Sequence, residues 1–156
     1  MIVFLDTGVI GLLSSPKKTG EAPECRQWLY YLLAKVVYVT SSDLCDYEVR
    51  RSLLLNQIKN TLATQGINNL DDLENLIEFL PITKDIMKRG AELWALSRVR
   101  GQPTAASESI DADIIIAATC QILQEEYPGQ KLIVATSNVK HLSRFLEAKE
   151  WREIKF

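Results

Sequence analysis

Four polar side chains interrupt stretches of the sequence that otherwise have the composition of buried core: Asp6, Glu48, Asp113 and Asn138. Burying an ionised carboxylate is costly unless a partner compensates its charge. Carboxylates that converge on one pocket also repel each other, so each resists ionising unless a cation is present. Oxygen ligands alone favour Mg²⁺ or Mn²⁺, which can activate a water molecule or stabilise charge on a phosphate. These residues therefore predict a divalent-cation site able to hydrolyse a phosphodiester bond.

Two of the candidate acids, Asp111 and Asp113, stand at the start of a strongly apolar helix that we expect over residues 110–126. Asp113 heads the apolar stripe of this helix, and an aspartate in the first turn also gains from the helix dipole. Asp111 is either the N-cap of the helix or a further member of the site, and the sequence leaves both open.

Glu48 lies on a helix capped within residues 40–43 and expected to run to about residue 60. Its carboxylate points along a partly apolar sector, at nearly the same angle as Leu44 and Leu55. A structural ion pair with Arg50 or Arg51 is the alternative to a role in chemistry.

Short apolar runs alternate with helical patterns along the whole chain. We expect strands at residues 2–5, 36–39, 79–82 and 132–135, and a final strand at Ile154. We expect helices at residues 7–13, 21–35, 41–60, 83–99, 110–126 and 139–146, and a short helix that begins near residue 71. The wholly apolar run 2–5 fits the centre of the sheet, and Pro81 places its strand at an edge. This alternation predicts an α/β fold, a three-layer α/β/α sandwich with a mainly parallel central sheet.

Residues that follow strands should meet, because function in such folds gathers outside the carboxyl ends of the strands. Asp6 follows the first strand, and Thr136, Ser137 and Asn138 follow a late one. Thr7 is expected to cap the first helix, and residues 101–109 to form a loop. His141, the single histidine, is expected on the surface or against a phosphate rather than on a metal. No function is assigned to residues 62–76.

Composition gives one ordinary globular domain spanning residues 1–156, because apolar residues make up 47%, charged residues 24%, and no Pro/Gly-rich linker divides the chain. No apolar run reaches membrane-spanning length and no signal peptide is visible, which favours a cytoplasmic protein with no membrane partner. The three cysteines are odd in number and far apart, which indicates reduced core thiols.

A net charge of −2 gives no global attraction to nucleic acid, so any such partner needs a local basic patch. The candidates are Arg50, Arg51, Arg98, Arg100, Lys140 and Arg144. Each of them is equally well explained as a solvated charge on a helix face.

Four motifs in order resemble the PIN-domain family, specifically the VapC-like ribonuclease toxins of type II toxin–antitoxin systems. They are Ile-Val-Phe-Leu-Asp-Thr at the start, Tyr-Glu-Val-Arg-Arg from Tyr47, Asp-Ala-Asp-Ile-Ile-Ile-Ala-Ala from Asp111, and Val-Ala-Thr-Ser-Asn-Val-Lys-His-Leu from Val134. Each motif is weak alone, but their order from Ile2 to about Phe145 is specific.

The resemblance implies a PIN-like fold and a metal-dependent endoribonuclease. In that case Asp6, Glu48 and Asp113 are the acidic metal-site residues, Asp111 is a possible extra ligand, Asn138 completes the catalytic set, and Thr7, Thr136 and Ser137 support it. Many members carry an aspartate where this chain has Asn138, so one Mg²⁺ or Mn²⁺ ion is better supported than two. The resemblance also implies an RNA substrate, an antitoxin protein partner and a homodimer.

Two other functions stay open at this point. A catalytically silent PIN scaffold that binds RNA or protein is compatible with Asn138. A phosphoryl-accepting receiver domain fits less well, because it needs paired acids after the first strand, where Asp6 stands alone. Apolar residues of the helix at 21–35, such as Trp28, Tyr31 and Leu32, serve either the core or a homodimer contact.

Overall fold

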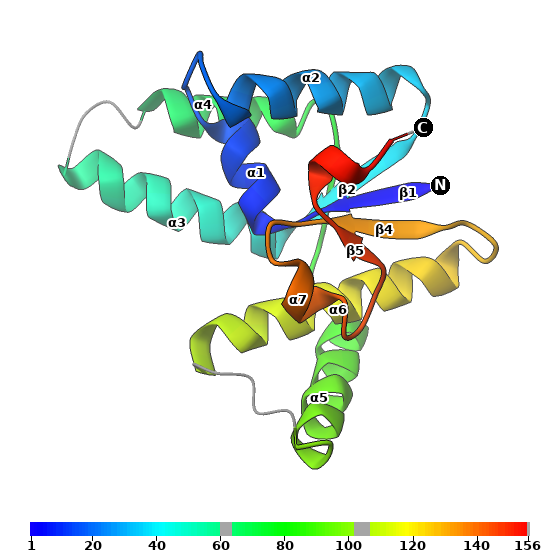
Figure 1. Ribbon diagram of the computed structural model, residues 1–156. Helices are drawn as coiled ribbons and strands as arrows, with labels where there is room; N and C mark the ends of the chain where they lie inside the picture. The colour runs from blue at the N-terminus through cyan, green and yellow to red at the C-terminus, as the bar shows by residue number, and fades with distance from the viewer. Residues whose placement is uncertain (60–63, 102–106, 156) are drawn as a thin grey trace.

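The computed structural model describes residues 1–59, 64–101 and 107–155, with the backbone alone at residues 59 and 107–111 (Figure 1). Its centre is a sheet in which all the described pairings are parallel, in the strand order β3-β2-β1-β4-β5. The strands are β1 (Ile2–Leu5), β2 (Tyr38–Ser42), β3 (Glu78–Leu80), β4 (Leu132–Ala135) and β5 (Ala148–Lys149). The central position of β1 and the edge position of β3 are both as predicted. All four β1 side chains are buried, as expected for a strand covered on both faces.

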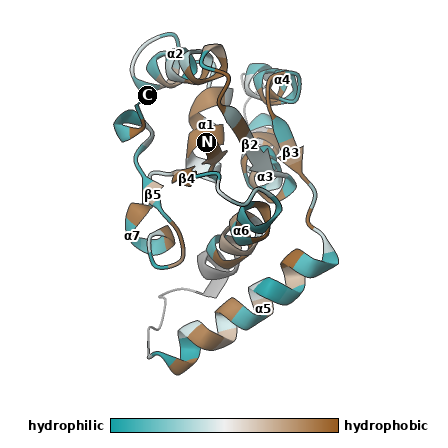
Figure 2. Cartoon of the chain, turned by 90° about the vertical axis from the view of Figure 1, so that its right-hand side faces the viewer, coloured by the Kyte–Doolittle hydropathy of each residue, from teal (hydrophilic) through white to brown (hydrophobic). Residues whose placement is uncertain are grey.

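Helices cover both faces of this sheet. In Figure 1, helices α1 (Thr7–Ser14), α2 (Glu21–Ala34) and α4 (Thr64–Leu73) lie above it, and α5 (Lys84–Val99) and α6 (Ser107–Glu126) lie below. Figure 2, which views the sheet end-on, shows the same three layers. Helix α3 (Asp43–Lys59) and the single-turn α7 (Val139–Leu142) flank the edge where β1 and β4 end. The predicted three-layer α/β/α sandwich is confirmed.

The main core packs β1 and β4 against α1, α2 and the inner face of α6, with Phe4, Ile10, Leu29 and Ile116 almost fully buried. A smaller cluster joins α5 to α6. The three cysteines are buried and unpaired, as predicted, and burial raises the pKa of Cys25 to about 12 and that of Cys45 to about 11. No helix in the described ranges is long and apolar enough to cross a membrane.

The second strand lies two to three residues later than predicted, at Tyr38–Ser42 instead of 36–39. Val36 has a positive φ of 56°, which belongs to the turn after α2. The polar end of the strand is buried because its hydroxyls are bonded: Thr40 donates to the Glu78 carbonyl at 2.8 Å and Ser41 to the Leu5 carbonyl at 2.7 Å. These partners are distant in sequence, so the local pattern does not reveal them.

Two helices begin earlier than predicted. Helix α4 starts at Thr64 rather than near residue 71, and its Gly66 packs so closely on α3 that an added Cβ would lie 2.8 Å from a Leu53 methyl carbon. Helix α6 starts at Ser107 rather than residue 110, so Asp111 lies inside the helix and is not its N-cap, and Asp113 lies beyond the first turn. The rest of the expected loop, residues 102–106, falls outside the described residues, as does the predicted end of α3 near residue 60.

Further boundaries differ from the prediction. Strand β3 is Glu78–Leu80 rather than residues 79–82, so Pro81 follows the strand instead of interrupting it. Helix α7 ends at Leu142 rather than residue 146. The last strand is β5, and Ile154 instead follows the 3-10 turn η2 (Trp151–Glu153).

Candidate active site

Asp6 is fixed at the point where β1 becomes α1. It has extended backbone angles and caps α1, because its Oδ1 accepts a hydrogen bond from the Thr7 amide at 2.7 Å. The N-cap is thus Asp6 and not Thr7, which is the first helical residue. The other oxygen, Oδ2, accepts from the Thr136 hydroxyl at 2.6 Å. Burial raises the pKa of Asp6, the bonds from Thr136 and Thr7 oppose that rise, and the charge of Glu48 adds to it.

The end of β4 supplies the partner of Asp6, as predicted for adjacent parallel strands. The Asp6 amide donates to the Ala135 carbonyl at 3.0 Å, which brings the two strand ends together. Thr136 is fully buried, and its hydroxyl also accepts from the Asn138 amide at 2.8 Å. Ser137 lies against the first turn of α1, where a Cβ on Gly8 would be 2.7 Å from its Oγ.

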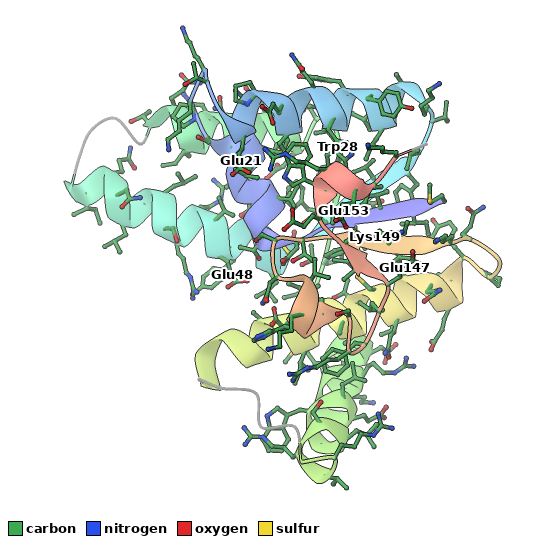
Figure 3. The ribbon with its side chains drawn as sticks, in the orientation of Figure 1. Glu21, Trp28, Glu48, Glu147, Lys149 and Glu153 are labelled. Atoms are coloured by element: carbon green, nitrogen blue, oxygen red, sulfur yellow. The ribbon has the colours of Figure 1, made fainter. Side chains whose placement is uncertain are left out.

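Glu48 reaches this edge from α3, and Figure 3 shows it on the side of the molecule where the strands end. The Thr7 hydroxyl donates to its Oε1 at 2.9 Å, and Arg51 lies 3.5 Å from its Oε2. The ion pair that the sequence left open as an alternative is therefore present with Arg51 but not with Arg50, which instead binds Asp46 and Asp71 at 2.8 Å each. Because Thr7 touches Glu48 and its amide binds Asp6, one residue connects the two carboxylates.

Asp113 approaches from α6, with 17% of its side chain exposed. Its Oδ2 lies 3.5 Å from the Asn138 side-chain nitrogen and 3.4 Å from Nδ1 of His141. Burial raises the pKa of Asp113 to about 6, with the charges of Asp6 and Glu48 acting in the same direction and His141 opposing them. Three carboxylates from three elements are thus close enough to influence each other electrostatically.

The arrangement constrains how a metal could be held. In the described part of the chain, no three Asp, Glu, His or Cys side chains lie close enough together to ligate one ion directly. The side chain of Asp111 is outside the described residues, so its predicted role stays a prediction. Mg²⁺ usually takes one or two carboxylates and several waters. The mutual repulsion at Asp6 and Asp113 is the kind that a cation relieves, so the residues fit an ion bound partly through water.

The predicted RNA-binding residues do not share one environment. Arg50 is held by the acids of α3 and α4, and this raises its pKa further. Arg98 stacks on the Trp94 ring at 4.9 Å, toward the end of α5. The remaining four candidates have exposed or partly exposed side chains: Arg51, Arg100, Lys140 and Arg144. Of these, Arg51 and Lys140 lie on the two elements that flank the carboxylates.

The side chain of His141 is 36% exposed, which agrees with the expected surface position. Its ring also lies beside Asp113, a contact that the sequence did not predict. The signal available was its spacing of three residues from Asn138, which puts the two side chains on one face if a helical turn follows.

The chain has been compared with known proteins. Neither a protein-family model nor a curated protein matches its sequence. Among solved structures, VapBC-1 from nontypeable Haemophilus influenzae matches with a TM-score of 0.65 and 18% identity, covering 97% of this chain and 99% of that one. VapBC2 from Rickettsia felis, bound to a promoter DNA fragment, matches with a TM-score of 0.67 and 19% identity, covering 97% of this chain and 99% of that one. FitAB bound to the IR36 DNA fragment matches with a TM-score of 0.68 and 20% identity, covering 99% of this chain and 98% of that one. The fold shared with these structures is the PIN-like α/β/α fold, and this chain adopts it over nearly its whole length.

Proposed function

We propose that this protein is a Mg²⁺- or Mn²⁺-dependent endoribonuclease. The observation that supports it best is the convergence of Asp6, Glu48 and Asp113 at the carboxyl edge of the sheet, where burial and charge repulsion raise the pKa of both aspartates. The shared fold with VapBC and FitAB structures supports the same class. A bound cation would supply an activated water and neutralise charge on the phosphate under attack.

The residues of this chain have separable tasks in the proposed reaction. Asp6 and Asp113 would hold the ion, Asp6 with its carboxylate already oriented by Thr136 and the Thr7 amide. Glu48, held by the Thr7 hydroxyl, would bind ion-coordinated water. Asn138 is exposed at the rim and can orient a water or a phosphate oxygen.

The test compares wild-type protein with Asp6→Asn and Asp113→Asn on a panel of single-stranded and structured RNAs, with Mn²⁺ or EDTA. Asp72→Asn is the matched control, because Asp72 is an exposed aspartate on α4, an element that supplies none of the three carboxylates. We expect cleavage to fall by more than about 100-fold in both site variants and in EDTA, beyond the 10–100-fold typical for loss of an outer-shell partner. Unchanged cleavage in EDTA would refute metal dependence.

A silent scaffold is the second candidate, and two observations favour it. Asn138 stands where a fourth carboxylate would strengthen the site, and no direct three-ligand group is formed by described residues. Calorimetric titration with Mn²⁺ separates the two functions, because a scaffold without a metal site would bind RNA without binding Mn²⁺.

We also propose that the chain acts in the cytoplasm as the toxin of a toxin–antitoxin pair. The support is its fold, since the similar structures are VapBC and FitAB complexes. A hollow of about 440 Å³ between α1, α2 and α4, lined in part by Tyr30 and Leu76, offers a place for a partner. Co-purification with the product of the neighbouring reading frame tests the pair, and Tyr30→Glu should weaken it. Homodimer formation stays a prediction, which light scattering on the purified chain would test.

A further inference from the structure

The segment from Thr136 to Leu142 contacts both aspartates of the site. At its start, the Thr136 hydroxyl donates to Oδ2 of Asp6 at 2.6 Å. Further along the segment, Asn138 and His141 both approach Oδ2 of Asp113, at 3.5 Å and 3.4 Å. These are the two polar contacts that the described residues make with the Asp113 carboxylate, and Oδ1 receives none from them.

His141 is held in place by the core and by the hydrogen bonds of its own turn. Its neighbour Leu142 is fully buried. The turn of α7 is closed by the His141 amide donating to the Asn138 carbonyl at 3.2 Å, and the Asn138 amide is in turn tied to Thr136. The imidazole therefore sits on a turn whose position is fixed independently of Asp113.

We propose that His141 is a positioning residue, which donates its Nδ1 hydrogen to Oδ2 of Asp113 and leaves Oδ1 for the cation. This inference rests on the proposed metal-dependent function. Outer-shell donors to a ligating carboxylate fix its orientation, and their loss typically costs 10–100-fold in metal affinity. The contact is long at 3.4 Å, as such contacts often are before the reacting groups assemble.

Two substitutions of His141 distinguish hydrogen-bond donation by Nδ1 from simple packing of the ring. His141→Phe keeps a ring of similar shape and removes both nitrogens. His141→Asn keeps an N–H donor at the same distance along the side chain as Nδ1. Ser143→Ala is the matched control, because Ser143 follows α7 directly and its hydroxyl bonds only to the Val139 carbonyl among the described residues.

The measurement is the Mn²⁺ dissociation constant by calorimetry, with kcat and KM for RNA cleavage alongside. We expect His141→Phe to raise the Mn²⁺ dissociation constant by about 10-fold, while His141→Asn and Ser143→Ala stay within about threefold of wild type. The KM for RNA at saturating Mn²⁺ should not change. If His141→Phe does not fold, His141→Leu takes its place in the comparison with His141→Asn.

Three outcomes would overturn the proposal. Wild-type Mn²⁺ affinity in His141→Phe would show that the ring does not position Asp113. Equal loss in the phenylalanine and asparagine variants would show that the donor is not what matters. A raised KM with unchanged Mn²⁺ affinity would show that His141 contacts the phosphate instead. Failure of the proposed function is distinguishable, because wild-type protein would then neither bind Mn²⁺ nor cleave RNA.

Discussion

Replacing Asp113 with asparagine should make the metal-free protein more stable at neutral pH. Burial, with help from Asp6 and Glu48, raises the pKa of this carboxyl from 3.8 to about 6. Ionising it in the folded state therefore costs more than ionising it in the unfolded chain. A shift of about 2 pK units corresponds to about 3 kcal/mol. Because 17% of the side chain is exposed, we expect a gain of about 1 to 3 kcal/mol in the free energy of unfolding.

The sign of the pH dependence follows from proton counting. Between about pH 4 and pH 6 the folded protein keeps a proton on Asp113 that the unfolded chain has released, so wild-type stability falls as pH rises through this window. Above about pH 6, Asp113 is ionised in both the folded and the unfolded chain, so its contribution to the free energy of unfolding no longer changes with pH. The amide introduced by Asp113→Asn cannot ionise, so the variant lacks this part of the decline.

Urea unfolding in EDTA, at steps from about pH 4 to pH 8, measures the difference. The Asp72→Asn control should change stability by no more than about 0.5 kcal/mol, as is usual for an exposed site. Added Mn²⁺ should stabilise wild type and not Asp113→Asn. The reasoning is refuted if the variant is less stable than wild type at pH 7, or if the difference does not vary with pH.

Three further predictions concern neighbouring contacts. Thr136→Val removes the hydroxyl that donates to Asp6, so calorimetry should show Mn²⁺ binding about 10-fold weaker than in wild type. Thr136→Ser keeps the hydroxyl and should bind Mn²⁺ as wild type does. Equal Mn²⁺ affinities in wild type and Thr136→Val would contradict this prediction. Arg50→Met should lower the free energy of unfolding in urea by about 1 kcal/mol, because it removes the ion pair between α3 and α4, but should leave the KM for RNA unchanged. Gly8→Ala places a Cβ 2.7 Å from Oγ of Ser137, so the Ser137 side chain must shift at the edge of the site. Cleavage should therefore slow, and a second change, Ser137→Ala, should reverse the effect.

Elements with a strong local pattern were predicted well. β1 is a continuous apolar run, and α5 begins at the predicted place because Thr83 caps it through the Ile86 amide at 3.2 Å. The misplaced elements depend on distant partners. The polar residues of β2 are buried because Ser41 bonds to the Leu5 carbonyl, and α4 extends toward Thr64 where it packs on Leu53.

In the candidate site, too, residues with a local sequence signal were predicted and contacts between distant residues were not. Asp6, Glu48 and Asp113 were identified because a carboxylate among apolar residues is conspicuous in sequence. The structure brings all three to one edge, together with Thr136 and Asn138. Thr7 was expected to support the site, but its link to Glu48 was not predicted, because the two residues are 41 positions apart. The contact between His141 and Asp113 was not predicted, because a single turn of helix such as α7 leaves no periodic pattern.

The order of the strands has a consequence for synthesis of the protein on the ribosome. Asp6 is made 130 residues before its partner Thr136. A nascent chain that has not yet produced β4 lacks Thr136, Asn138 and His141, so its early aspartate and glutamate have no assembled site. Chains fold from the N-terminus as they emerge, but here β1 cannot pair with β4 until β4 has been made. Until the ribosome has made β4, the nascent chain therefore carries Asp6 and Glu48 without the side chains that complete the site.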